Sequence, residues 1–181
     1  MPGERIDMPK NDEIIQKVKA KAHANDKHSS GCSQSVLGAL QQELGIGDKE
    51  SFKAATVLSG GLRRGETCGA LIGGLMGLGL VIGREKMEDT NTYHKALSVS
   101  DEISDRFKEE LQKQFGLNPE LQSTLCTEIQ ERVLGRSFDF HKEFEDFLQA
   151  GGHSDTGCPK VCAIAAQVAV EKIIELKGAK T

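Results

Sequence analysis

The chain has 181 residues, the size of one domain and enough to bury a hydrophobic core. It carries 27 acidic and 23 basic residues for a net charge of −4, and its aromatic residues are seven Phe and one Tyr, with no Trp. An acidic domain with few aromatic rings lacks the basic surface and the stacking platforms that nucleic-acid binding needs. We therefore expect no nucleic-acid partner.

The apolar segments are too short to suggest a membrane protein. The most apolar run, residues 70–82, is interrupted by four glycines, and a helix needs about 20 apolar residues to span a bilayer. The polar first ten residues do not resemble a secretory signal. We expect no membrane insertion and a cytoplasmic location, where cysteines are more often metal ligands or catalytic thiols than structural disulfides.

Apolar residues recur at helical spacing along the chain, and no strand-like alternation stands out. Residues 1–10 are polar and charged and are expected to form a flexible N-terminal tail. The predicted helices cover about residues 11–28, 32–44, 49–59, 68–82, 90–115, 119–133 and 158–177, with a short apolar-faced element near residues 140–147. The predicted fold is therefore all-α: a single-domain multi-helix bundle over residues 11–181 with a glycine-rich central helix.

Glycines and proline mark several of the expected helix boundaries. Gly45 and Gly116 are placed to end helices, and Asn118-Pro119 reads as a cap followed by a first helical residue. Within residues 68–82, the spacing of Gly69, Gly73 and Gly77 leaves a strip without side chains along one helix face. Such a strip favours close packing of another helix, with close approach of an inorganic group as the alternative.

The five cysteines carry the main chemical signal. Cys32, Cys68 and Cys158 lie near predicted helix starts, where the positive end of the helix dipole favours a thiolate. Cys126 is expected about two turns into its helix, and taken alone it reads as core packing. Cys162 follows Cys158 by four residues, so both sulfurs lie on one helix face and suit a shared metal.

No Cys-x-x-Cys pair occurs, which argues against a thioredoxin-like site and against common zinc-finger spacing. A metal site would have to be assembled from distant helices. His153 is a weaker ligand candidate that reads more simply as a solvated loop residue. The pair Arg63-Arg64 reads as a solvated turn rather than an anion site, and no Ser/His/Asp order, phosphate loop or dinucleotide fingerprint appears.

These residues resemble a family of redox-active proteins defined by four widely spaced cysteines, the second within Cys-Gly-Ala-x-x-Gly. The matching pieces span about residues 30–176: Gly31-Cys32-Ser33-Gln34-Ser35-Val36-Leu37, Gly60-Gly61, Gly65-Glu66-Thr67-Cys68-Gly69-Ala70-Leu71-Ile72-Gly73, Phe115-Gly116 with Cys126, and Cys158-Pro159-Lys160-Val161 with Ala165-Ala166. A similar domain in split-Soret cytochromes is associated with an iron–sulfur-type centre. The resemblance implies Cys32, Cys68, Cys126 and Cys158 as cofactor and metal ligands. Cys162 is extra to the family pattern and is an alternative fourth ligand.

The first hypothesis is an iron–sulfur cluster, [2Fe–2S], held by these thiolates for electron transfer or redox sensing. The alternatives are a metal-free dithiol–disulfide oxidoreductase using Cys68 and Cys32, a structural zinc site, and a helical interaction protein whose cysteines fill the core. No catalytic residue is assigned outside the thiol alternative. We expect a redox partner of unknown identity and consider a homodimer formed through the glycine strip or the helix at residues 90–115.

Overall fold

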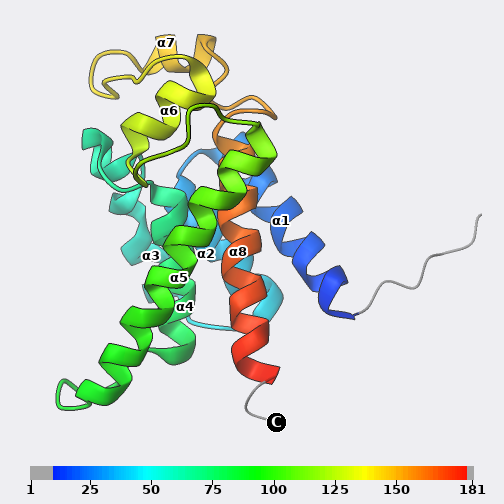
Figure 1. Ribbon diagram of the computed structural model, residues 1–181, viewed down its shortest axis with the longest axis vertical. Coiled ribbons are helices and arrows are strands. Elements are labelled where there is room, and N and C mark those ends of the chain that lie inside the picture. Colours follow the sequence, from blue (N-terminus) through cyan, green and yellow to red (C-terminus); the bar gives the residue numbers. More distant parts are fainter. Residues whose placement is uncertain (1–9, 179–181) are drawn as a thin grey trace, which may run out of the picture.

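Eight α-helices make up most of residues 10–178, the part of the chain described by the computed structural model (Figure 1). Their bounds are Lys10–Ser29 (α1), Cys32–Leu44 (α2), Lys49–Ala54 (α3), Gly69–Ile82 (α4), Thr90–Phe115 (α5), Cys126–Leu134 (α6), Phe144–Gln149 (α7) and Cys158–Gly178 (α8). No strand occurs among these residues, and the predicted all-α class is confirmed. Apart from Lys10, which begins α1, the predicted tail at residues 1–10 lies outside the described residues.

Helix α8 forms the centre of the core. It packs against α1, α2, α4 and α5, and side chains such as Val168, Ala169 and Ile173 are completely buried. The helix is apolar around most of its circumference, which is the pattern of a helix enclosed by others. Figure 1 shows it running from the end that holds α6 and α7 down to the opposite end of the molecule.

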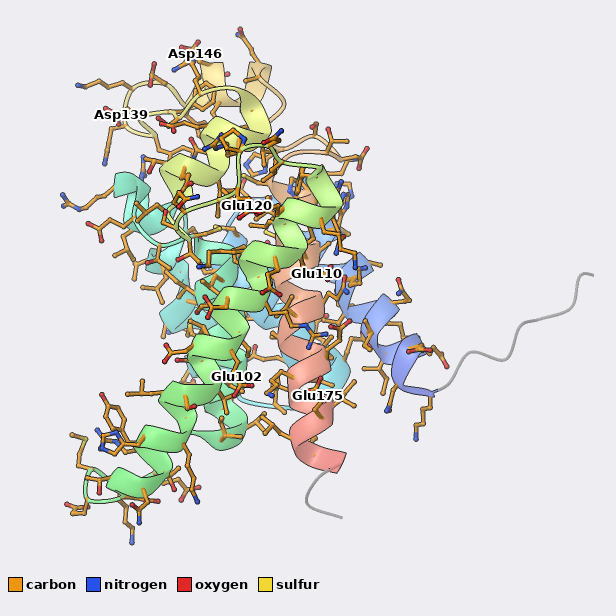
Figure 2. The ribbon with its side chains drawn as sticks, in the orientation of Figure 1. Glu102, Glu110, Glu120, Asp139, Asp146 and Glu175 are labelled. Carbon is orange, nitrogen blue, oxygen red and sulfur yellow. The ribbon has the colours of Figure 1, made fainter. Side chains whose placement is uncertain are left out.

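Charged residues join α5 to α8 along their exposed sides. Lys172 on α8 lies with its Nζ 2.7 Å from Glu102 of α5 and 3.4 Å from Glu175 of its own helix. Figure 2 shows Glu102 and Glu175 on these two helices and Asp139 and Asp146 at the end of the molecule that holds α7. These ion pairs lie at the solvent edge, so the apolar face of α5 contributes most of the packing.

The glycine strip of α4 packs against α2. A Cβ atom on Gly73 would overlap the carbonyl oxygen of Ser33, and one on Gly77 would lie 2.5 Å from a methyl group of Leu40. Small residues at these two positions are therefore what allows the two backbones to approach. The strip is covered within the chain, which leaves α5 as the surface considered for a homodimer.

Two predicted helices are shorter than expected. The third ends at Ala54 and continues as a 3-10 turn over Ala55–Leu58. The sixth was expected from residue 119 and instead begins at Cys126, so the prediction for residues 119–125 is wrong. The physical reason is a backbone pairing with residues 66–68, described below, which uses the groups that a helix would need.

A turn of unusual backbone conformation precedes α4. Gly60, Gly61, Leu62 and Arg63 all have φ between 58° and 64°, the left-handed region that costs about 1–2 kcal/mol for a residue other than glycine. The turn spans Gly61–Gly65 and returns the chain toward Cys68. Among the described residues, no helix combines the length and the apolar character needed to cross a membrane.

Candidate functional site

A cavity of about 440 Å³ lies where the starts of several helices meet, and all five cysteines line it. They come from segments separated by tens of residues, as expected for a site assembled by the fold. None of the five is in a disulfide. Cys68, Cys126 and Cys162 are buried, whereas Cys32 and Cys158 are half-buried. The structure therefore brings together every cysteine that the sequence singles out.

Four of these cysteines occupy helix N-termini. Cys32, Cys126 and Cys158 are the first residues of α2, α6 and α8, and Cys68 is the N-cap of α4. The prediction for Cys126 was wrong, because its helix begins at this residue rather than two turns earlier. The predictions for Cys68 and Cys158 were each one position off: Cys68 was expected in the first turn and Cys158 at the cap. The N-termini of four helices thus meet at one cavity.

Backbone pairing fixes Cys68 relative to Cys126. Thr67 and Leu125 form an isolated antiparallel bridge. The Cys68 N–H donates to the carbonyl of Thr124 at 2.8 Å, and the Cys126 N–H donates to the carbonyl of Glu66 at 2.6 Å. Both cysteines directly follow a bridge residue, so their separation is set by main-chain geometry. The Glu66 side chain is exposed, and its backbone rather than its carboxylate serves the site.

Hydrogen-bond donors reach two of the sulfurs. The N–H of Gly60, in the left-handed turn, donates to Cys32 Sγ at 3.4 Å. The buried side chain of Gln130 donates from Nε2 to Cys126 Sγ at 3.2 Å, and its Oε1 accepts from the N–H of Phe138 at 2.9 Å. Such donors stabilise a sulfur that carries negative charge, whether as a free thiolate or as a metal ligand.

Burial raises the pKa of every cysteine thiol, contrary to the expectation that helix starts would lower it. Burial is the largest cause in each case; it raises the pKa of Cys126 to about 12 and those of Cys68, Cys158 and Cys162 well above the usual value. The pKa of Cys32 is raised by burial and then by the charge of Asp26, with opposing hydrogen bonds from Gly60, Ser59 and Ser33. Desolvation and neighbouring negative charge therefore outweigh the helix dipoles.

A chain of polar side chains runs into the cavity from its rim. Exposed Ser30 lies with its Oγ 3.1 Å from His153 Nε2, and His153 Nδ1 lies 3.3 Å from Oδ2 of Asp26. Asp26 is 1% exposed. His153 was expected to be solvated and is instead largely buried, with 17% of its side chain exposed. Asp26 had no signal in the sequence, because it lies among the polar residues that end α1.

The remaining wall is aromatic. Phe140, Phe144 and Phe147 line the cavity, and Phe147 packs edge-on against His153 with ring centroids 5.3 Å apart. Arg63 also lines it, and its guanidinium donates to the carbonyl of Phe140 at 3.1 Å. Arg63 was expected to be an ordinary turn residue; the structure assigns it to the rim, where it ties the left-handed turn to the segment before α7.

The five cysteines line a cavity and do not converge on a single point. Among the described residues, no three His, Cys, Asp or Glu side chains are gathered closely enough to hold a single metal ion. Four thiolates of a closed zinc site would lie about 3.8 Å apart, given Zn–S bonds of about 2.3 Å, and would leave no cavity between them. The donor set is therefore rich in thiols, and its members border a cavity.

Comparison with known proteins adds one match. A family model described as "Putative redox-active protein (C_GCAxxG_C_C)" matches residues 31–172, which include all five cysteines and the segment Cys68-Gly69-Ala70-Leu71-Ile72-Gly73. Neither the curated proteins nor the solved structures contain a match.

Proposed function

The chain belongs to this family of redox-active proteins, and on that premise we propose that it carries an iron–sulfur cluster for electron transfer or redox sensing. Cys32, Cys68, Cys126 and Cys158 are the proposed ligands, and [2Fe–2S] is the proposed cluster type. The observation that carries the proposal is the convergence of four helix-start cysteines, none in a disulfide, on one cavity of about 440 Å³. Four thiolates are the usual ligand number for such clusters.

The chain's own residues would support the cluster in three ways. The cysteines supply anionic ligands, and the first-turn N–H groups of α2, α4, α6 and α8 oppose the accumulated negative charge. The Gly60 N–H and the Gln130 amide donate to Cys32 and Cys126, the type of bond that tunes a cluster's potential. The phenylalanines limit the access of water. When bound, the cluster would supply one-electron redox chemistry.

Two of the three alternative hypotheses, thiol redox chemistry and structural zinc, have less support. A dithiol–disulfide oxidoreductase needs an accessible thiolate near neutral pH, whereas burial raises the pKa of both Cys32 and Cys68. A structural zinc site with four thiolate ligands would leave no cavity between the sulfurs, whereas the cysteines here line one. Metal binding remains compatible with high thiol pKa values, because a bound cation displaces the thiol protons.

The experiment that tests the proposal is anaerobic purification of the full chain followed by an absorption spectrum and assays for iron, zinc and sulfide. We expect coloured protein with iron and sulfide in near-equal amounts. Serine variants of the four proposed ligands should each lose most of the iron, whereas Cys162→Ser is the matched control and should keep it. Colourless protein without iron after reconstitution would exclude the cluster. Zinc in its place would favour the structural-zinc alternative.

A further inference from the structure

Two buried polar groups face each other inside the cavity without a hydrogen bond between them. Neither carboxylate oxygen of Asp26 has a hydrogen-bond partner, and neither does Nδ1 of His153, although Nδ1 and Oδ2 are only 3.3 Å apart. Asp26 is 1% exposed. A buried carboxylate without a hydrogen bond is costly, and a bound cation would offset that cost.

The contact of the other His153 nitrogen with Ser30 is compatible with either tautomer, and the tautomer that would free Nδ1 for a metal has its hydrogen on Nε2. His153 Nε2 lies 3.1 Å from the hydroxyl of Ser30, which accepts when Nε2 carries the hydrogen. The Nδ1 atom is then a bare lone pair directed toward a carboxylate. A metal-ligating histidine commonly has this arrangement, with one nitrogen free for the metal and the other held by an outer partner.

The spacing of the pair matches two ligands on one metal ion. Nitrogen and oxygen ligands at about 2.0–2.2 Å from a tetrahedral centre lie about 3.3–3.6 Å apart. Arg63 is the only lysine or arginine among the described residues that line the cavity, and its guanidinium is bound to the carbonyl of Phe140. A divalent cation would therefore satisfy both buried groups and offset the carboxylate charge.

We propose that Asp26 and His153 are two ligands of a mononuclear divalent transition-metal site, with Cys162 as the third. Cys162 lines the same cavity and lies outside the four-cysteine set assigned to the cluster. The charge of Asp26 is the largest neighbouring charge that raises the pKa of the Cys162 thiol. The thiol must turn toward the pair when the metal binds, because no three ligands are gathered yet. One O, one N and one S ligand suit Zn²⁺, Co²⁺ or Fe²⁺ and leave a position open for water.

This site is independent of the cluster, and its test measures a different metal. Full-length protein, purified anaerobically with whatever iron it holds, is dialysed against Co²⁺, and cobalt, iron and sulfide are measured on the same sample. We expect about one cobalt per chain without loss of iron, and a visible ligand-field spectrum of tetrahedral Co²⁺ with a sulfur-to-cobalt charge-transfer band.

Three variants and one matched control assign the ligands. Asp26→Asn and His153→Gln should each weaken cobalt binding about tenfold or more, while the iron content stays near wild type and each variant still unfolds cooperatively. Cys162→Ser should remove the charge-transfer band. His23→Gln is the control, because His23 Nε2 lies 3.1 Å from the carbonyl of Asp155 and does not line the cavity. If Asp26→Asn does not fold, His153→Gln carries the test alone.

The outcomes separate this inference from the proposed function. Cobalt that binds equally well to Asp26→Asn and His153→Gln, that displaces iron, or that does not saturate overturns the mononuclear site and leaves the cluster proposal standing. Protein that holds no iron after reconstitution but still binds cobalt through Asp26 and His153 supports the mononuclear site and excludes the cluster.

Discussion

The sulfur of Cys32 occupies the space in which a side chain at Gly69 would begin. A Cβ atom built on Gly69 would overlap Cys32 Sγ and would also lie 2.9 Å from the carbonyl oxygen of Leu58 and 3.1 Å from Cα of Ser59. Glycine at position 69, directly after Cys68, therefore makes room for the sulfur of Cys32. Cys32 lies 36 residues before Cys68 in the sequence (68 − 32 = 36). The first two cysteines share one steric constraint.

Gly69→Ala should destabilise the protein and disturb Cys32. We expect a loss of about 1–3 kcal/mol in the free energy of unfolding, because two of the three contacts are backbone atoms that cannot easily move away. Gly79→Ala is the matched control in the same helix, since a Cβ there meets nothing within 4 Å. It should gain about 0.5–1 kcal/mol from helix propensity. Urea unfolding of both variants checks the pair, and equal stabilities would contradict the steric argument.

The raised thiol pKa values predict that the reduced, metal-free protein loses stability in alkali. Above its usual pKa of 9.0, the Cys126 thiol ionises in the unfolded chain but stays protonated in the fold up to about 12. The folded state then binds more protons than the unfolded state, so stability falls as the pH rises through this window. Urea unfolding at about pH 8 and about pH 10 measures the loss. Cys126→Ser should lose less stability over the same interval, and an unchanged loss would show that Cys126 does not contribute.

Gln130 links Cys126 to the segment before α7, and its replacement separates two effects. Gln130→Ala removes the donor to Cys126 Sγ and leaves the buried N–H of Phe138 without its acceptor. We expect a loss of about 1–3 kcal/mol. Gln130→Glu keeps the acceptor for the Phe138 N–H but places negative charge beside the sulfur. Its main expected effect is a lower reduction potential of a bound cluster. Thermal unfolding and redox titration of both variants test this, with exposed Gln122→Ala as the control.

Asp26→Asn should stabilise the metal-free protein. The amide removes a buried charge and can donate to Nδ1 of His153, which is 3.3 Å from Oδ2 in the native chain. We expect a gain of about 1–3 kcal/mol in the free energy of unfolding. Asp155→Asn is the matched control, because the exposed Asp155 carboxylate already pairs with Lys27 at 2.7 Å and should show little change. A marked loss of stability in Asp26→Asn would show that the carboxylate has a structural partner.

The left-handed turn stores strain at Leu62, which has a φ of 58°. Leu62→Gly should leave the free energy of unfolding unchanged or raise it by up to about 1 kcal/mol, because relief of the strain offsets the entropy that glycine loses on folding. Leu97→Gly is the comparison at similar exposure, 44% against 38%, in the interior of α5. It should cost about 1 kcal/mol. Thermal unfolding distinguishes the two, and a loss at Leu62 as large as at Leu97 would refute the strain argument.

The residue types at helix ends predicted where helices stop, but no feature of the sequence predicted pairing between distant segments. Gly45 and Gly116 end α2 and α5 in the left-handed conformation, as their positions indicated. The helical spacing of Leu121, Leu125 and Ile129 predicted a longer sixth helix, which the pairing of residues 124 and 126 with residues 66 and 68 prevents. No periodicity in one segment reveals a partner that is almost 60 residues away, as Thr67 and Leu125 are (125 − 67 = 58).

The candidate site, too, could be predicted only in part from the sequence. The cysteine set could be identified from residue type and order. Its protonation could not, because the sequence shows the helix starts that favour a thiolate but not the burial that opposes it. Asp26 and His153 are separated by 127 residues (153 − 26 = 127), and only the docking of the loop before α8 on the end of α1 makes them neighbours.

The bridge between Thr67 and Leu125 makes two amide hydrogens reporters of the intact site. The N–H groups of Cys68 and Cys126 are both used in main-chain bonds across it. Their exchange with deuterated solvent requires these two segments to separate, an opening that also parts the second and third cysteines. Slow deuterium exchange at these two positions, followed by mass spectrometry, would signal a closed cysteine site without an attached probe or a coloured cofactor. It would do so equally in protein with and without a cofactor.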